Sequence, residues 1–152
     1  MTDQAGSELK GKVAIVTGAG RMRGIGRGTA TVLARMGAHV VVTGTGRDPA
    51  SYPQDEKDAG WRDIHSTAEQ IEAFGVRALP LVSNVADQED VQKMIDAAVA
   101  EFGRLDIIVN NAAAPYGDDR VSVMDMQTDV FKSIVDVKLM GTFYACKAAA
   151  AQ

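Results

Sequence analysis

Several features that mark other classes of protein are missing from this 152-residue chain. Cys146 is its only cysteine, which excludes an internal disulfide framework and fits a reducing compartment. No apolar run approaches the ~18 residues of a membrane span, and the N-terminal segment lacks the apolar core of a signal peptide. The formal net charge of −4 gives no reason to expect nucleic acid or an anionic membrane as a partner. We therefore expect a cytoplasmic protein with neither kind of partner.

Histidine, a common metal ligand, is also scarce. The two histidines, His39 and His65, are not connected by any metal-ligand spacing, so we expect no metal site. The remaining composition is ordinary for a globular protein, with 46% hydrophobic and 24% charged residues in a chain long enough to bury a core. We expect one domain over residues 1–152.

Apolar strands alternate with amphipathic helices along the chain. Strands are predicted at residues 12–17, 39–43, 77–83 and 105–110. Helical spacing predicts helices that begin near Ile25, Ile64, Asp87 and Met126. The predicted apolar stripe of the first helix is Ile25, Val32, Leu33 and Met36. This alternation predicts an α/β fold with a parallel sheet covered by helices on both faces.

Three loops at the ends of predicted strands are candidates for ligand binding, because ligands of open α/β sheets bind at the carboxyl ends of the strands. They are TGAGRMRGIG (17–26), SNVAD (83–87) and NNAAAPYG (110–117). Glycines 18, 24 and 26 would let backbone amides approach a pyrophosphate at the positive end of a helix. Each loop also has an ordinary interpretation: a flexible turn for the first, a helix N-cap for the second, and a turn with backbone-capping asparagines for the third, which taken alone the sequence favours.

Together, the motifs TG…GIG, NV-x-D, NNA and DVKLMGTF resemble the short-chain dehydrogenase/reductase family, especially its 3-oxoacyl-acyl-carrier-protein-reductase-like members. The resemblance runs from about Lys10 to the last residue. It implies a Rossmann-type doubly wound parallel sheet, of which this chain holds the N-terminal four strands. It also implies NAD or NADP as the cofactor, and hydride transfer between nicotinamide and a small carbonyl or alcohol substrate. The intact protein would be a homo-oligomer, either a dimer or a tetramer.

The same resemblance assigns individual residues to parts of the cofactor. Asn110 is expected to be structural and to tie the fourth strand to Thr17. The pyrophosphate is assigned to Gly18, Gly24, Ile25 and Gly26. The adenine is assigned to Asn84 and Val85, and the nicotinamide ribose to Asn111 and Ala112.

Two departures from the family pattern concern the choice of cofactor. Five residues rather than three separate TG from GIG, so the sequence leaves open whether Arg21 or Arg23 points at the cofactor. Gly44 stands where an NAD-binding member has an acid, and Arg47 follows it. Basic residues at this point suit a 2′-phosphate, so the sequence favours NADP over NAD. Asp48 could still turn inward, which keeps NAD open.

Residues 45–63 are a connection about ten residues longer than the family's usual one, and they contain the only tryptophan, Trp61. Long irregular insertions in compact domains are often functional. Two interpretations stay open. Either the segment folds over the adenosine end of the cofactor, or it is a surface excursion with Trp61 packed on the body.

No catalytic residue can be assigned. The family's acid/base pair, Tyr-x-x-x-Lys, does not occur, since none of the three tyrosines has a lysine four residues later. The residues at that spacing from Tyr52, Tyr116 and Tyr144 are Glu56, Arg120 and Ala148. Lys138 stands where many members have an asparagine of the proton relay, and a lysine brings no acceptor. We expect the chain to be truncated before a catalytic half and inactive alone. The alternative function is a non-catalytic dinucleotide-binding module or sensor.

Overall fold

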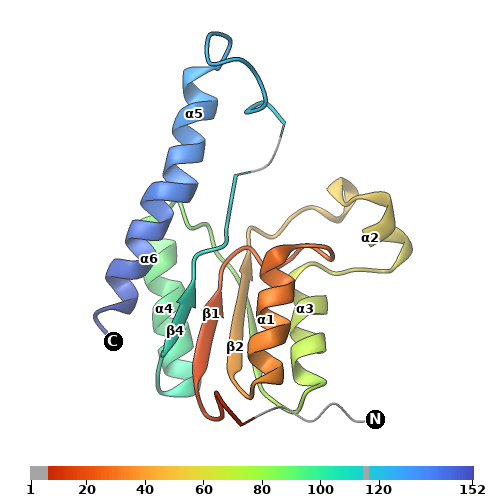
Figure 1. Cartoon of the computed structure of the whole chain (residues 1–152), viewed down its shortest axis with the longest axis vertical. Coiled ribbons are helices and arrows are strands. Elements are labelled where there is room, and N and C mark those ends of the chain that lie inside the picture. The colour runs from red at the N-terminus through yellow and green to blue at the C-terminus, as the bar shows by residue number, and fades with distance from the viewer. Residues whose placement is uncertain (1–6, 115–116) are drawn as a thin grey trace.

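The structure is a computed structural model that describes residues 7–114 and 117–152 (Figure 1). Its centre is a sheet of four parallel strands in the spatial order β3-β2-β1-β4. The strand bounds are Val13–Val16 for β1, His39–Gly44 for β2, Ala78–Val82 for β3 and Ile107–Val109 for β4. All four predicted strands are therefore present, each within a few residues of its expected bounds. The two central strands carry the apolar runs that burial on both faces requires.

Helices cover both faces of the sheet, as the alternation predicted (Figure 1). Helices α1 (Ile25–Arg35) and α3 (Ile64–Glu72) pack together on one face. Helices α4 (Gln88–Phe102) and α6 (Gly141–Ala149) pack together on the other. The fold is thus a Rossmann-like doubly wound sheet, which places the carboxyl ends of its strands at one edge.

The remaining elements extend from this body. A 3₁₀ turn, η1 (Pro49–Ser51), and a short helix, α2 (Gln54–Asp58), lie in the long connection between β2 and α3. Helix α5 (Thr128–Val135) and the π-helical turn η2 (Asp136–Met140) continue into α6 as one rod (Figure 1). The predicted long C-terminal helix is therefore confirmed, with a π turn in its middle.

Helix α1 differs from the prediction in the face that it buries. Ile25 is 82% exposed and Val32 is 54% exposed, whereas the buried residues are Gly26, Ala30 and Ala34. The predicted stripe of large apolar residues was wrong at these two positions. Small side chains face the sheet because the helix lies close to β1 and β2, and a larger residue there would be overpacked.

Asp106 fastens the start of β4 to the start of β1. Its Oδ2 accepts a hydrogen bond from the Val13 amide at 2.9 Å, and its Oδ1 lies 3.1 Å from the Lys12 ammonium. The hydrogen bond from the Arg104 guanidinium, with those from Val13 and Lys12, holds the pKa of this carboxyl well below its usual range despite its partial burial. The ionised form is therefore the one that joins the two strands.

Asp106→Asn is expected to lower the free energy of unfolding at pH 7 by about 1–2 kcal/mol, because charge-assisted hydrogen bonds are lost. A lowered pKa stabilises the fold above the unfolded-state pKa of about 4, and this stabilisation is lost as the pH falls further. Urea unfolding at pH 7 and pH 3 should show the gap between wild type and variant shrinking with acid. Asp96→Asn, on the exposed face of α4, is the control. A gap that does not change with pH would contradict this role.

Candidate cofactor site

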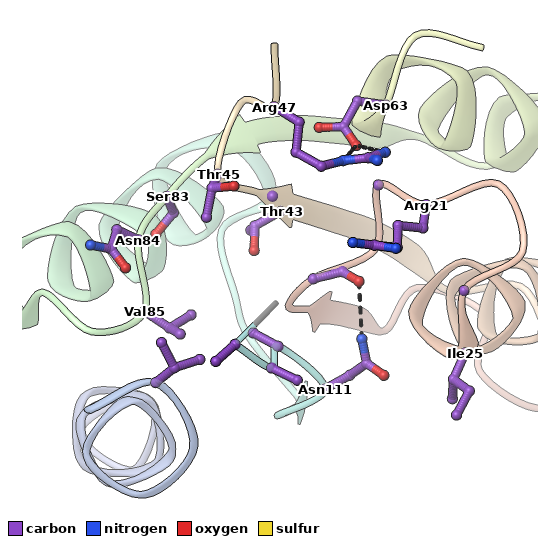
Figure 2. Close-up of a pocket in the computed structure, with 18 of the residues that line it drawn as sticks. Arg21, Ile25, Thr43, Thr45, Arg47, Asp63, Ser83, Asn84, Val85 and Asn111 are labelled. Carbon is purple, nitrogen blue, oxygen red and sulfur yellow. Dashed lines mark hydrogen bonds and ion pairs between the residues drawn. The ribbon is translucent and has the colours of Figure 1, made fainter. Parts of the chain in front are cut away.

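A cavity of about 510 Å³ opens at the carboxyl ends of the strands (Figure 2). All the residues that the sequence assigned to the cofactor line it, except Gly26, which is buried behind the loop. The lining consists of Gly18, Gly20, Arg21, Arg23, Gly24, Ile25, Thr43, Gly44, Thr45, Arg47, Asp63, Ser83, Asn84, Val85, Asn111, Ala112, Ala113, Ala114 and Val137.

Two glycines allow the loop after β1 to pack against neighbouring backbone. Gly18 has φ +68°, and a Cβ there would lie 2.8 Å from the Cα of Ala112. A Cβ on Gly26 would lie 2.4 Å from Nδ2 of Asn111 and 2.7 Å from the carbonyl oxygen of Gly18. Any larger residue at either position would therefore displace the loop or the end of β4. Gly24 is the N-cap of α1, so the helix begins at the cavity and directs its positive end there.

Asn111, not Asn110, ties β4 to the loop. Its Nδ2 donates to the carbonyl oxygens of Thr17 at 2.8 Å and Gly18 at 3.0 Å, and its amide donates to Thr17 Oγ1 at 3.0 Å. Asn110 is exposed and lies 3.4 Å from the Cys146 sulfur. The structural role expected for Asn110 was therefore wrong. Directly after β4 the Asn111 amide also lies 3.1 Å from the Val109 carbonyl oxygen, and this tight turn places Asn111 rather than Asn110 beside Thr17.

The two loop arginines point to different surroundings. Arg21 directs its guanidinium into the cavity (Figure 2), and no ion pair involves it within residues 7–114 and 117–152. Arg23 is 80% exposed at its side chain and pairs with Asp55 of α2 at 2.9 Å. Of the two alternatives that the sequence left open, Arg21 is thus the one whose charge faces the cavity.

The inserted segment packs on the body and also reaches the cavity. Trp61 is buried and donates its Nε1–H to the carbonyl oxygen of Gly20 at 2.6 Å. Glu56, which is 3% exposed, accepts a hydrogen bond from the Met22 amide at 2.8 Å. These two contacts hold the extended glycine loop in place. The interpretation with Trp61 packed on the body is confirmed, but the segment is more than a surface excursion because it supplies Thr45 and two charged residues to the cavity lining.

Arg47 is the first of these two charged residues, and its guanidinium binds the carboxylates of Glu56 and Asp63. Its Nη1 lies 3.0 Å from Glu56 Oε2, while Nε and Nη2 lie 3.1 and 2.8 Å from Asp63 Oδ1. Its guanidinium also stacks over the Tyr52 ring at 4.6 Å. Burial by itself would lower the pKa of Arg47, but the hydrogen bonds with Asp63 and Glu56 outweigh it and raise the pKa. Arg47 is therefore not the free cation that the sequence suggested for a phosphate.

Asp63 is the second, and sequence reasoning missed it. The residue is 5% exposed, and its Oδ2 has no hydrogen-bond partner among the described residues. It stands immediately before α3, where an aspartate normally caps a helix, yet it makes no capping hydrogen bond. Asp48, the acid that the sequence left open, instead caps η1 through a 2.8 Å bond to the Ala50 amide. The signal in the sequence was Gly44, which ends β2 without an acidic side chain and so leaves the site to take its acid from elsewhere.

The opposite end of the cavity is apolar. Val85, Ala112, Ala113 and Val137 lie there, with Asn84 at its edge. Val85 is fixed by α6, where a Cβ on Gly141 would lie 2.9 Å from its carbonyl oxygen. Among the described lining residues, the ionisable side chains are Arg21, Arg23, Arg47 and Asp63, and all belong to the loop after β1 or the inserted segment.

The candidates for acid/base chemistry lie elsewhere. Lys138 is exposed on η2, so it is a surface residue rather than part of the cavity wall. Tyr144 packs beside Phe143 in α6, and Tyr52 stacks with Arg47. Tyr116 lies outside the described residues.

These features define a class of protein. A parallel doubly wound sheet, a glycine loop between its first strand and helix, and a cavity at the strand ends are the arrangement that binds dinucleotides. The pattern of the family described as "short chain dehydrogenase" matches residues 12–152. The chain therefore belongs to the short-chain dehydrogenase/reductase family.

Its relatives include dehydrogenases of several substrates. L-rhamnose 1-dehydrogenase (NAD(P)(+)) of Azotobacter vinelandii is 39% identical over 140 residues, which cover 91% of this chain and 48% of that protein. Carveol dehydrogenase from Mycobacterium avium in complex with NAD has a TM-score of 0.79 and 28% identity, covering 95% of this chain and 50% of that one. A short chain dehydrogenase from Burkholderia cenocepacia in complex with NADP has a TM-score of 0.75 and 32% identity, covering 95% and 52%.

The chain spans about half the length of the curated relatives that it matches. Within the residues that the structure describes, no helix is long and apolar enough to cross a membrane. In the same residues, no cluster of three or more side chains of the kinds that bind metal ions occurs.

Proposed function

We propose that this chain is the cofactor-binding part of an NAD- or NADP-dependent oxidoreductase that acts on a small carbonyl or alcohol. The loop after β1 carries this proposal. Gly18 and Gly26 let this loop pack closely against neighbouring backbone beside the cavity, where a side chain at either position would not fit. The names of the relatives support the same reaction class. A cytoplasmic location and a homo-oligomeric state belong to the proposal as well.

The cavity's two ends suit two parts of a dinucleotide. The loop after β1, the start of α1 and Arg21 would hold the pyrophosphate through amides, helix dipole and charge. The apolar end near Val85, Ala112 and Val137 would orient the nicotinamide and exclude water from one of its faces. When bound, the nicotinamide would supply the carbon that accepts or donates the hydride.

Proton transfer would depend on groups outside these 152 residues. The described residues at the apolar end have no ionisable side chain, and the sequence has no Tyr-x-x-x-Lys pair. We propose that the other half of the protein, which the relatives possess, supplies that pair and the substrate pocket.

The experiment is a cofactor assay on the full-length protein. NADH or NADPH oxidation should be followed at 340 nm with a panel of ketones, and binding of both cofactors by calorimetry. We expect saturable cofactor binding and turnover with at least one substrate. Binding without any turnover across a broad panel would favour a non-catalytic module or sensor, and no binding of either cofactor would overturn the proposal.

A further inference from the structure

The end of β2 lacks the acid that selects the cofactor in many Rossmann-type sites. In those sites an acid ~20 residues beyond the glycine loop accepts a hydrogen bond from the adenosine ribose 2′-hydroxyl. Here that position is Gly44, which lines the cavity without a side chain. The ribose end of the site therefore needs its acceptor from another part of the chain, or has none.

The carboxylate of Asp63 occupies the space that Gly44 leaves. Its Oδ2 lies 3.4 Å from the place where a Cβ of Gly44 would stand. Its Oδ1 lies 1.9 Å from the place of a Cβ on Gly20, so the loop needs glycine at that point. Gly44 at the end of β2 and Gly20 in the loop after β1 thus make room for one carboxylate at the edge of the cavity.

The backbone of Asp63 adopts a conformation that an aspartate rarely takes. Its φ is 52° and its ψ is −131°, the only positive φ outside glycine among the described residues. Such a conformation is unfavourable and persists where the surroundings impose it, often at binding sites. Oδ2 is in addition a buried acceptor without a partner, which is itself destabilising. Both features indicate that the carboxylate is held for a ligand.

Arg47 holds the carboxylate by one oxygen and leaves the other unused. It donates two hydrogen bonds to Oδ1, at 3.1 and 2.8 Å. Because an aspartate carboxylate turns about a broad, two-fold torsion, either oxygen can face the cavity while its mate stays on Arg47. With Glu56 the group has one positive and two negative charges, and all three side chains are less than one-fifth exposed. A net negative group of this kind repels a 2′-phosphate.

We propose that Asp63, supplied by the inserted segment and positioned by Arg47, accepts a hydrogen bond from the adenosine ribose 2′-hydroxyl and makes this site selective for NAD over NADP. The proposal rests on the proposed dinucleotide function, and it replaces the sequence's preference for NADP. Arg47 acts as a positioning residue, since its charge is used by Asp63 and Glu56. Arg21, whose guanidinium also faces the cavity, remains for the pyrophosphate, which both cofactors share.

The test is calorimetric titration of the full-length protein with NAD and NADP. We expect NAD to bind roughly ten- to a hundred-fold more tightly, the ratio expected for one charge-assisted hydrogen bond. Asp63→Asn should weaken NAD by a similar factor without weakening NADP, so that the ratio collapses. Asp58→Asn is the matched control, because this exposed acid of the same segment accepts a hydrogen bond from Gln54 and does not belong to the cavity lining, so the ratio should stay unchanged.

A second titration needs no variant, in case Asp63→Asn fails to fold. NAD that lacks the adenosine 2′-hydroxyl should bind the wild type at least tenfold more weakly than NAD. Equal affinity for the deoxy analogue would overturn the proposal. Wild-type binding of NADP as tight as that of NAD would also overturn it, and would assign the 2′-phosphate to Arg21. If neither cofactor bound at all, the proposed function itself would have failed instead.

Discussion

The isolated 152-residue chain is expected to show hydride transfer at least ~10²–10⁴-fold slower than the full-length protein. This range is what a positioned general acid/base contributes, and the apolar end of the cavity offers none among its described residues. Loss of substrate orientation should lower the rate further. NADH and NADPH oxidation by both proteins, with the same ketone panel, measures the difference.

Cofactor binding by the isolated chain is the control for this comparison. The loop after β1, Arg21, Asp63 and the end of β4 all lie within the 152 residues, so a folded chain should retain measurable affinity. If the isolated chain binds cofactor but shows no turnover, the chain is folded, and its inactivity is due to missing catalytic groups rather than to misfolding. Turnover within tenfold of the full-length rate would refute the assignment, and would direct attention to Lys138 or Tyr144.

Gly26→Ala is expected to weaken binding of both NAD and NADP by roughly ten- to a hundred-fold. The added methyl would meet Asn111 Nδ2 at 2.4 Å and the Gly18 carbonyl oxygen at 2.7 Å. Relief requires the loop to move away from β4 and breaks the two hydrogen bonds from Asn111. Overpacking of this kind costs about 1–3 kcal/mol, which accounts for the expected factor.

Gly28→Ala provides the matched control in the same helix. A Cβ at Gly28 meets nothing within 4 Å, so cofactor affinity should not change. Because alanine favours helix over glycine, this variant should be about 0.5–1 kcal/mol more stable. Calorimetry and thermal unfolding of both variants check the pair. Equal cofactor affinity in Gly26→Ala and Gly28→Ala would show that the packing of the loop after β1 does not contribute to cofactor binding.

The fold was predictable because its signals are local. The apolar β-branched runs of β1 and β2 identify strands buried on both faces, and Asp87 does cap α4 through the amides of Glu89 and Asp90. The buried face of α1 was not predictable in the same way. Its contact with the sheet uses Ala30 and Ala34, and a pattern analysis that weights large apolar residues finds Val32 instead.

The cavity's position was also predictable, since the strand ends of such sheets bind ligands. The partners of its charges were not. Arg47 and Asp63 are 16 residues apart, and their pairing depends on how the inserted segment folds back over Gly20 and Gly44. The same folding brings Asp55 to Arg23, so that these two side chains form an ion pair. The sequence shows which charged residues are present, but their spacing does not show which of them form ion pairs with one another.

A crystal structure of the full-length protein with NAD is the most direct test that this cavity binds a nicotinamide dinucleotide. The account predicts the pyrophosphate on the backbone of the loop after β1 and the adenosine ribose beside Asp63. The nicotinamide should lie toward Ala112 and Val137. A dinucleotide bound away from this cavity, or bound with its adenosine at the apolar end, would contradict the account.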